Sequence, residues 1–87
     1  MHLDGTQVGP VVNRIRRAQG QLNAVLRMLE EGQECEDVVT QLAAVSKALD
    51  RAGFALVAQG LQQCLQDPSD EGAADLERLE RLFLSLA

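Results

Sequence analysis

The chain has 87 residues, and its 13 acidic residues outnumber the 8 lysines and arginines, which gives a formal net charge of −5. A domain of this size buries little apolar surface by itself, so we expect it to associate with further copies of itself. No apolar run reaches the length of a membrane span, and the first residues lack the pattern of a secretory signal, which argues against a membrane or secreted protein and predicts a cytoplasmic one.

The composition favours an all-α fold. Tryptophan and tyrosine are absent, and two phenylalanines are the only aromatic residues, so the interior must be aliphatic. Helix bundles often have such interiors, and no alternation typical of a strand occurs along the chain. We predict one domain over residues 1–87 with three helices, at about residues 6–31, 36–66 and 70–86.

The first predicted helix is amphipathic and carries positive charge. Its apolar residues include a set at intervals of seven, namely Val8, Ile15, Leu22 and Leu29, which indicates one long apolar stripe. Four arginines, Arg14, Arg16, Arg17 and Arg27, occur between residues 5 and 29, and no acidic residue does. A local basic surface of this kind can bind phosphate even on an acidic protein, because salt screens distant charges. Gly32 is placed to end the helix.

The second predicted helix has an apolar face wider than a surface helix needs, so it can pack against the first helix and against another chain. Lys47 and Arg51 are neighbours on it, four positions apart. Gly53 and Gly60 interrupt its interior, where each glycine costs about 1 kcal/mol relative to alanine. The close approach of a neighbouring backbone is the simplest reason for them.

The two cysteines, Cys35 and Cys64, mark the ends of this second helix. A helix rises about 1.5 Å per residue, so two positions 29 residues apart on one helix lie about 43 Å apart. A disulfide or a shared metal needs the two residues within about 7 Å. If the thiols act together, they must come from two chains, and two antiparallel copies of the helix would bring Cys35 of one beside Cys64 of the other.

The third predicted helix follows the segment at residues 67–70, which ends the second. Ser69 is a good N-cap for it, and Asp70 and Glu71 lie favourably in its first turn.

Simpler interpretations stay open for each of these residues. Both cysteines can be small core residues, the arginines and lysine can form a solvated face, and His2, the only histidine, can be a solvent-exposed residue near the terminus. The sequence has no nucleophile with an adjacent base, no carboxylate pair and no phosphate-binding glycine loop, so we expect no enzyme activity.

Three runs of sequence resemble one known family. The runs NRIRRAQGQL (13–22) and RMLEEGQECEDVVTQLAAVSKALDRAG (27–53), and then the LxxC that ends at Cys64, are similar to the copper-sensing operon repressor (CsoR) family of small bacterial transcriptional repressors. The similarity covers about residues 10–66. It implies an antiparallel four-helix homodimer core that assembles into a dimer of dimers, binds operator DNA and releases it when an inducer reacts at the cysteines.

The resemblance also assigns residues. Cys35 and Cys64 match the family's two inducer-sensing cysteines, and Arg14 and Arg51 match basic positions implicated in operator binding. To these we add Arg16, Arg17 and Lys47, because they lie near the matched positions.

The inducer follows from one departure. The family's copper sensors have a histidine four residues before the second cysteine, and here that residue is Gly60. A cysteine pair without this histidine resembles the persulfide-sensing (CstR-like) branch, whose inducer is a sulfane-sulfur donor such as a polysulfide and which needs no cofactor. We expect Cys35 to attack and Cys64 to resolve the product into a di-, tri- or tetrasulfide bridge between chains, with Gly60 leaving room for the added sulfur.

Two alternatives remain at this point. One is a Cu(I)-responsive repressor of the same family, in which Cys35 and Cys64 bind the metal with His2 as a candidate third ligand. The other is a helical interaction module that does not bind DNA.

Overall fold

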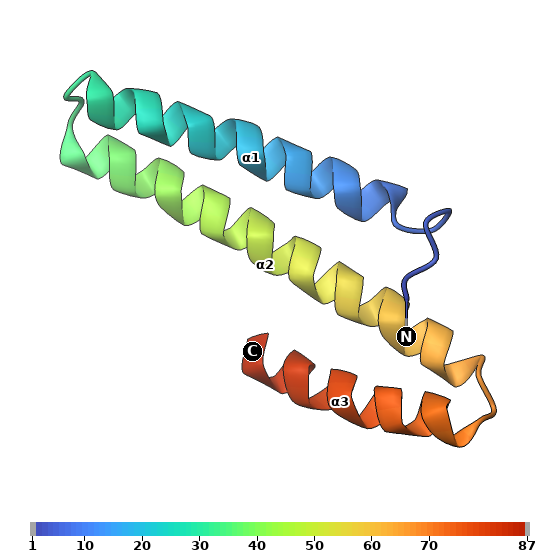
Figure 1. Cartoon of the computed structure of the whole chain (residues 1–87). Coiled ribbons are helices and arrows are strands. Elements are labelled where there is room, and N and C mark those ends of the chain that lie inside the picture. Colours follow the sequence, from blue (N-terminus) through green and yellow to red (C-terminus); the bar gives the residue numbers. More distant parts are fainter. Residues whose placement is uncertain (1, 87) are drawn as a thin grey trace.

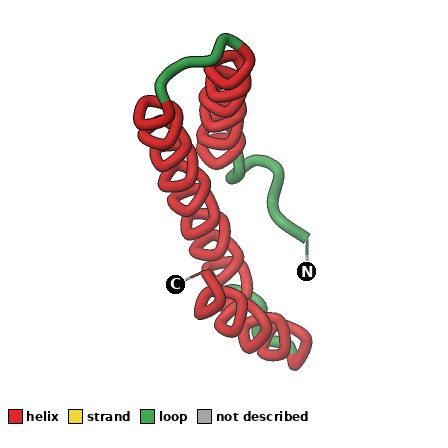
Figure 2. The backbone as a smooth tube through the Cα atoms, turned by 90° about the vertical axis from the view of Figure 1, so that its left-hand side faces the viewer, coloured by secondary structure: helices red, strands yellow, loops and turns green. Residues whose placement is uncertain are grey.

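The computed structural model describes residues 2–86 and consists of three helices: α1 (Gly9–Glu30), α2 (Cys35–Leu65) and α3 (Asp70–Leu86). This confirms the predicted all-α fold, and no strand occurs among these residues. Helices α1 and α2 form an antiparallel hairpin, and α3 folds back along the C-terminal part of α2 on the side away from α1 (Figure 1). Figure 2 shows the same arrangement from the loop end, with α2 as the long rod on which the other two helices pack.

The predicted helix boundaries agree with the structure within one residue, except at the start of α1. We expected the helix from about residue 6, but it begins at Gly9. The reason is a preceding turn, in which the Asp4 carboxylate accepts hydrogen bonds from the Thr6 backbone N–H (2.9 Å) and from its hydroxyl (2.7 Å). Pro10 then occupies the first turn of the helix, where its missing N–H costs nothing.

The connection between α1 and α2 is a left-handed glycine turn. Gly32 has a φ of +68°, its N–H donates to the Leu29 carbonyl (3.2 Å), and the next N–H, that of Gln33, donates to the Met28 carbonyl (3.1 Å). These two bonds define a Schellman motif, which satisfies carbonyls that the helix end would otherwise leave open. The predicted role of Gly32 in ending the helix is therefore correct.

The contact between α1 and α2 uses small side chains at intervals of seven. The buried residues are Val11, Ala18 and Val25 on α1 and Val38, Val45 and Ala52 on α2. Most of the apolar stripe identified in the sequence of α1 is exposed in the single chain, since Ile15 and Leu22 are each 43% accessible and Leu29 is 60% accessible. The wide apolar surface of α1 thus packs against α2 through a neighbouring stripe and leaves its larger residues uncovered.

Helix α3 starts as predicted and packs onto α2 through a few specific contacts. The Ser69 hydroxyl accepts a hydrogen bond from the Gly72 N–H (3.3 Å), which is the expected N-cap. A Cβ on Gly72 would come within 2.6 Å of the Asp67 carbonyl oxygen, so this close turn requires glycine. Phe54 and Phe83 form an edge-to-face pair with ring centroids 5.5 Å apart.

Gly53 faces a side chain of α3. The close approach of a neighbouring backbone, which the sequence suggests as the reason for this glycine, does not occur among the described residues. A Cβ at this position would lie 3.4 Å from the Leu86 Cδ1 atom. This distance is that of an ordinary van der Waals contact, so the end of α3 packs onto α2 at Gly53 without requiring a glycine there.

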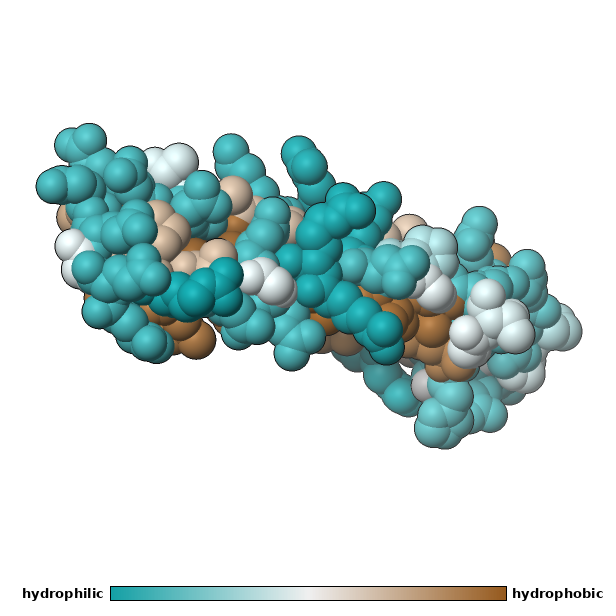
Figure 3. All heavy atoms as spheres, turned by 90° about the horizontal axis from the view of Figure 1, so that it is seen from above, coloured by the Kyte–Doolittle hydropathy of each residue, from teal (hydrophilic) through white to brown (hydrophobic). Residues whose placement is uncertain are grey.

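The single chain is extended and leaves much apolar surface uncovered. Its accessible surface is 6520 Å² and its radius of gyration is 16.7 Å, whereas a compact chain of this mass has about 5,000 Å² and about 12 Å. In Figure 3, apolar side chains reach the surface in patches along the hairpin between polar ones. Within residues 2–86, none of the helices has the length and hydropathy that crossing a bilayer requires.

Candidate functional site

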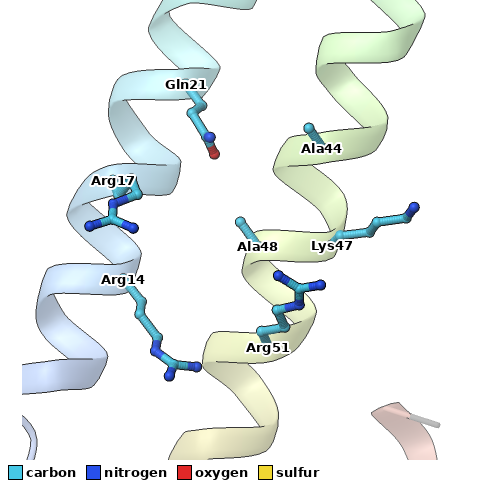
Figure 4. A pocket seen from close by; sticks show the side chains of 7 residues that line it. All are labelled: Arg14, Arg17, Gln21, Ala44, Lys47, Ala48 and Arg51. Atoms are coloured by element: carbon cyan, nitrogen blue, oxygen red, sulfur yellow. The ribbon is translucent and has the colours of Figure 1, made fainter.

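Four basic side chains surround one groove between α1 and α2. The groove has a volume of about 520 Å³ and is lined by Arg14, Arg17, Gln21, Ala44, Lys47, Ala48 and Arg51 (Figure 4). We call it the basic groove. Arg14 extends from α1 toward α2, and the two alanines leave space between the helices. No carboxylate lines the groove in the part of the chain that the structure describes, so its potential is positive.

The structure separates Arg16 from the other predicted basic residues. Successive helix positions are rotated by about 100°, so Arg16 and Arg17 point to different sides of α1. Arg16 lines an apolar groove of about 380 Å³ with residues that include Leu3, Val12, Ile15 and Leu56. The structure therefore brings together four of the five predicted residues and places Arg16 on another face.

Gln21 is a groove residue that the sequence analysis missed. Its Oε1 atom is buried and accepts no hydrogen bond from the described residues, although Gln21 lines the same groove as the four cationic side chains. The signal was present in the sequence, because Gln21 follows Arg17 by four positions and Arg14 by seven, which puts all three on one helix face.

Cys35 and Cys64 lie at the two ends of one continuous helix. Cys35 is the first residue of α2 and is exposed, whereas Cys64 lies near its end and is only 5% accessible. Because α2 is unbroken, the two thiols cannot meet within one chain, as the sequence predicted. Their separation of 29 residues is close to eight full turns, so both project within about 20° of the same side of α2.

Cys64 lines a small cavity at the α2–α3 junction, which we call the Cys64 chamber. The chamber has a volume of about 210 Å³, and its other lining residues are His2, Gln63, Asp67, Glu71, Gly72 and Asp75. Burial raises the pKa of the Cys64 thiol above its ordinary value of 9.0, and the negative charges of Asp75 and Asp67 raise it further. This thiol is therefore protonated at neutral pH and is a poor nucleophile.

The structure gives little support to a metal site within one chain. Among residues 2–86, no group of three or more His, Cys, Asp and Glu side chains is arranged to hold a metal ion. His2 is exposed, as expected, but it lies at the Cys64 chamber, where its carbonyl accepts a hydrogen bond from Gln63. Gly60, one turn before Cys64, is buried and offers no ligand.

Comparison with known proteins identifies relatives of the chain. The model of a family described as metal-sensitive transcriptional repressors matches residues 9–85. The copper-sensing transcriptional repressor RicR of Mycobacterium tuberculosis is 39% identical over 59 residues, which are 68% of this chain and 62% of that protein. The copper-sensing transcriptional repressor CsoR of the same organism is 33% identical over 70 residues, or 78% of this chain and 59% of that protein.

A third relative is matched over more of its own length. The uncharacterized protein YrkD of Bacillus subtilis is 42% identical over 45 residues, which are 52% of this chain and 71% of that protein. The chain thus spans less than two thirds of the two copper-sensing relatives, but more than two thirds of this one.

Proposed function

Because the chain belongs to the family of metal-sensitive transcriptional repressors, we propose that it binds operator DNA as a homodimer or homotetramer and releases it when its cysteines react. The observation that carries this proposal is the position of the two cysteines on one side of a single unbroken helix. That arrangement provides a reactive site only when a second copy of the chain is present.

The basic groove is the surface that we assign to DNA. Arg14, Arg17, Lys47 and Arg51 gather four positive charges on one side of the hairpin, and no carboxylate of residues 2–86 lines the groove between them. Arginine and lysine side chains that neutralise phosphates supply most of the affinity of such proteins for DNA. The acidic residues that give the chain its negative net charge lie mainly in residues 30–37 and 67–80, away from these four.

The opposite side of the hairpin is the surface that we assign to the second copy. The exposed apolar residues Val12, Ile15, Leu22, Leu26 and Leu29 of α1 and Val39, Leu42, Leu49 and Leu56 of α2 form it. We call it the apolar face. The rotation of 100° per residue places these positions and the basic groove on opposite sides of the plane through α1 and α2. Two hairpins joined through their apolar faces make a four-helix bundle with the basic grooves outside.

An antiparallel arrangement of the two hairpins pairs the cysteines. Both thiols project toward the side of α2 that carries Leu42 and Leu49, so they lie at the edge of the apolar face. When two copies of α2 run in opposite directions, Cys35 of one chain meets Cys64 of the other at each end. Each dimer then holds two such pairs.

The chemistry that fits this pair is a reaction with sulfane sulfur. The thiolate of Cys35 attacks a sulfur of a polysulfide, the S–S bond of the polysulfide breaks, and the shortened polysulfide leaves with the electron pair. The Cys64 thiol of the other chain then attacks the Cys35 sulfur of this persulfide, and the outer sulfur leaves with the electron pair, takes up the Cys64 proton and departs as hydrogen sulfide. The two thiols are oxidised to a bridge, and the polysulfide is reduced.

The order of attack follows from exposure and charge. Cys35 is exposed at the start of α2 and open to a reagent, whereas Cys64 is buried, and burial together with the charges of Asp75 and Asp67 raises its pKa. Gly60 lies one turn before Cys64 and has no side chain, so a bridge of three or four sulfur atoms has room beside Cys64. Replacement of Gly60 by valine should therefore weaken the response to polysulfide.

A mixture of two single variants tests the pairing. Cys35→Ser and Cys64→Ser proteins are each treated with polysulfide, and so is a mixture in which subunits have exchanged. We expect intact-mass spectrometry to show a bridged dimer only in the mixture, because only there does an intact Cys35 face an intact Cys64. A bridge in either variant alone, or none in the mixture, would contradict the proposed dimer.

A second candidate is a Cu(I)-responsive repressor, which the names of the copper-sensing relatives favour. Cys35 and Cys64 of two chains would supply two thiolates, and His2 lies at the same chamber as Cys64. Titration against a copper chelator separates the two candidates. Tight binding of one Cu(I) per cysteine pair, lost in both serine variants and coupled to DNA release, would favour copper over polysulfide.

A further inference from the structure

The N-terminal segment, residues 2–7, is fastened across the C-terminal part of α2 (Figure 1). We call it the N-terminal arm. Two glutamine side chains one turn apart on α2 hold its backbone. The Gln59 Nε2 donates a hydrogen bond to the Gln7 carbonyl, and the Gln63 Nε2 donates one to the His2 carbonyl. The Gln63 Oε1 also accepts a hydrogen bond from the Asp4 N–H (3.2 Å).

The arm itself has a defined shape. The Asp4 carboxylate binds the backbone and the hydroxyl of Thr6, and the Gln7 N–H donates to the Asp4 carbonyl (3.0 Å). Leu3 contributes to the apolar groove that also contains Val8. The arm is thus anchored by a hydrophobic contact as well as by the two glutamines.

One end of the arm lies at the Cys64 chamber. His2 and Gln63 line this chamber together with Cys64, and the first turns of α3 line the other side. Cys64 is 5% accessible in this arrangement, whereas Cys35, at the other end of α2, is exposed. The arm and α3 therefore limit access to one of the two thiols and not to the other.

We propose that the N-terminal arm is a gate over Cys64 and that Gln63 is the residue that latches it. Opening the gate requires Gln63 to exchange both of its hydrogen bonds for water, and it lifts Leu3 from the apolar groove that also contains Val11. The chamber volume of about 210 Å³ is several times the roughly 30 Å³ of a water molecule. A small reagent therefore fits inside the chamber, whereas a large reagent can react with Cys64 only while the arm is displaced. This proposal concerns access to the thiol and goes beyond the proposed function, because it holds whichever inducer is correct.

Alkylation of the full-length protein tests the gate. Iodoacetamide serves as a small reagent and a maleimide attached to polyethylene glycol as a large one, and peptide mass spectrometry follows each cysteine separately. In the native protein, Cys64 should lose more of its reactivity than Cys35 when the reagent becomes larger. The variant Gln63→Ala should speed the reaction of Cys64 with the large reagent about tenfold, as the loss of two hydrogen bonds predicts.

Two further variants give the matched comparison. Gln62→Ala makes the same change one position away at an exposed residue of α2 and should leave both rates unchanged. Leu3→Ser loosens the arm without a substitution in α2. It should speed the reaction of Cys64 with the large reagent, as Gln63→Ala does. In all of them Cys35 is the internal reference.

Two results would overturn the gate. One is an unchanged Cys64 rate in both Gln63→Ala and Leu3→Ser, and the other is an equal acceleration of Cys64 and Cys35, which would indicate general loosening of the fold. Neither result bears on the proposed function, because DNA binding and its response to polysulfide are measured separately on the same variants.

Discussion

Removing one arginine from the basic groove should lower the salt dependence of DNA binding, whereas removing the adjacent arginine should not. Arg17 lines the groove, and Arg16 lies on another face of α1 beside apolar residues. Arg16→Ala and Arg17→Ala change the net charge equally, and each replaces one of two adjacent residues of the same helix. The pair therefore separates the effect of total charge from the effect of position.

The number of cations in the groove sets the expected magnitude. Each phosphate neutralised contributes about −0.9 to the slope of log affinity against log salt. If all four cations of one groove contact phosphates, the slope is about −3.6, and affinity falls ~150-fold between 50 and 200 mM salt. Arg17→Ala leaves three contacts, a slope of about −2.7 and a ~40-fold fall. When both grooves of a dimer engage, the slopes double to about −7.2 and −5.4.

Fluorescence anisotropy with labelled DNA from upstream of the protein's own gene is a suitable assay, performed at several salt concentrations. Arg16→Ala should retain the native slope within about 0.3. Equal slopes for Arg17→Ala and the native protein, or a larger loss for Arg16→Ala, would refute the assignment of DNA to this groove. Binding that is weak and insensitive to salt in all three proteins would favour an interaction module that does not bind DNA.

Three further predictions concern the α2–α3 junction and α1. Gly72→Ala introduces a backbone clash and should lower the free energy of unfolding by about 1–3 kcal/mol, whereas Gly20→Ala, in open space on α1, should raise it by up to about 1 kcal/mol in urea denaturation. Because the folded state raises the pKa of Cys64, the neutral thiol stabilises the fold fully below pH 9, and this contribution is lost as the pH rises through the raised pKa. Asp75→Asn should lower the pKa of Cys64 and move the midpoint of its alkylation to lower pH. An unmoved midpoint would exclude a role for the Asp75 carboxylate. Phe83→Leu removes an edge-to-face aromatic pair and should cost about 0.5–1.5 kcal/mol beyond the lost buried area, which a native-like melting temperature would contradict.

Local features were the most predictable from the sequence. Gly32 ends α1 in a left-handed turn and Ser69 caps α3, because such positions depend on the φ angle or the hydroxyl of a single residue. The start of α1 was wrong by three residues, because the side chain of Asp4 stabilises a turn that competes with an additional helical turn.

The choice of buried stripe was not predictable in the same way. The sequence of α1 contains one apolar set with Ile15 and Leu22 and another with Val11 and Ala18, and periodicity alone ranks the larger residues first. In the structure the smaller set is buried, because small side chains allow α1 and α2 to approach closely. The larger set is left on the apolar face.

The sequence by itself determined the three helices and the separation of the two cysteines, because helix periodicity and the rise per residue are properties of the local backbone. Tertiary structure alone decided that the basic residues of α1 and those of α2 share one groove, and that the N-terminal arm lies over Cys64. These features join residues as many as 61 positions apart. They depend on the angle at which one helix packs on another, and that angle follows from the fit of many side chains at once, which no single stretch of sequence encodes.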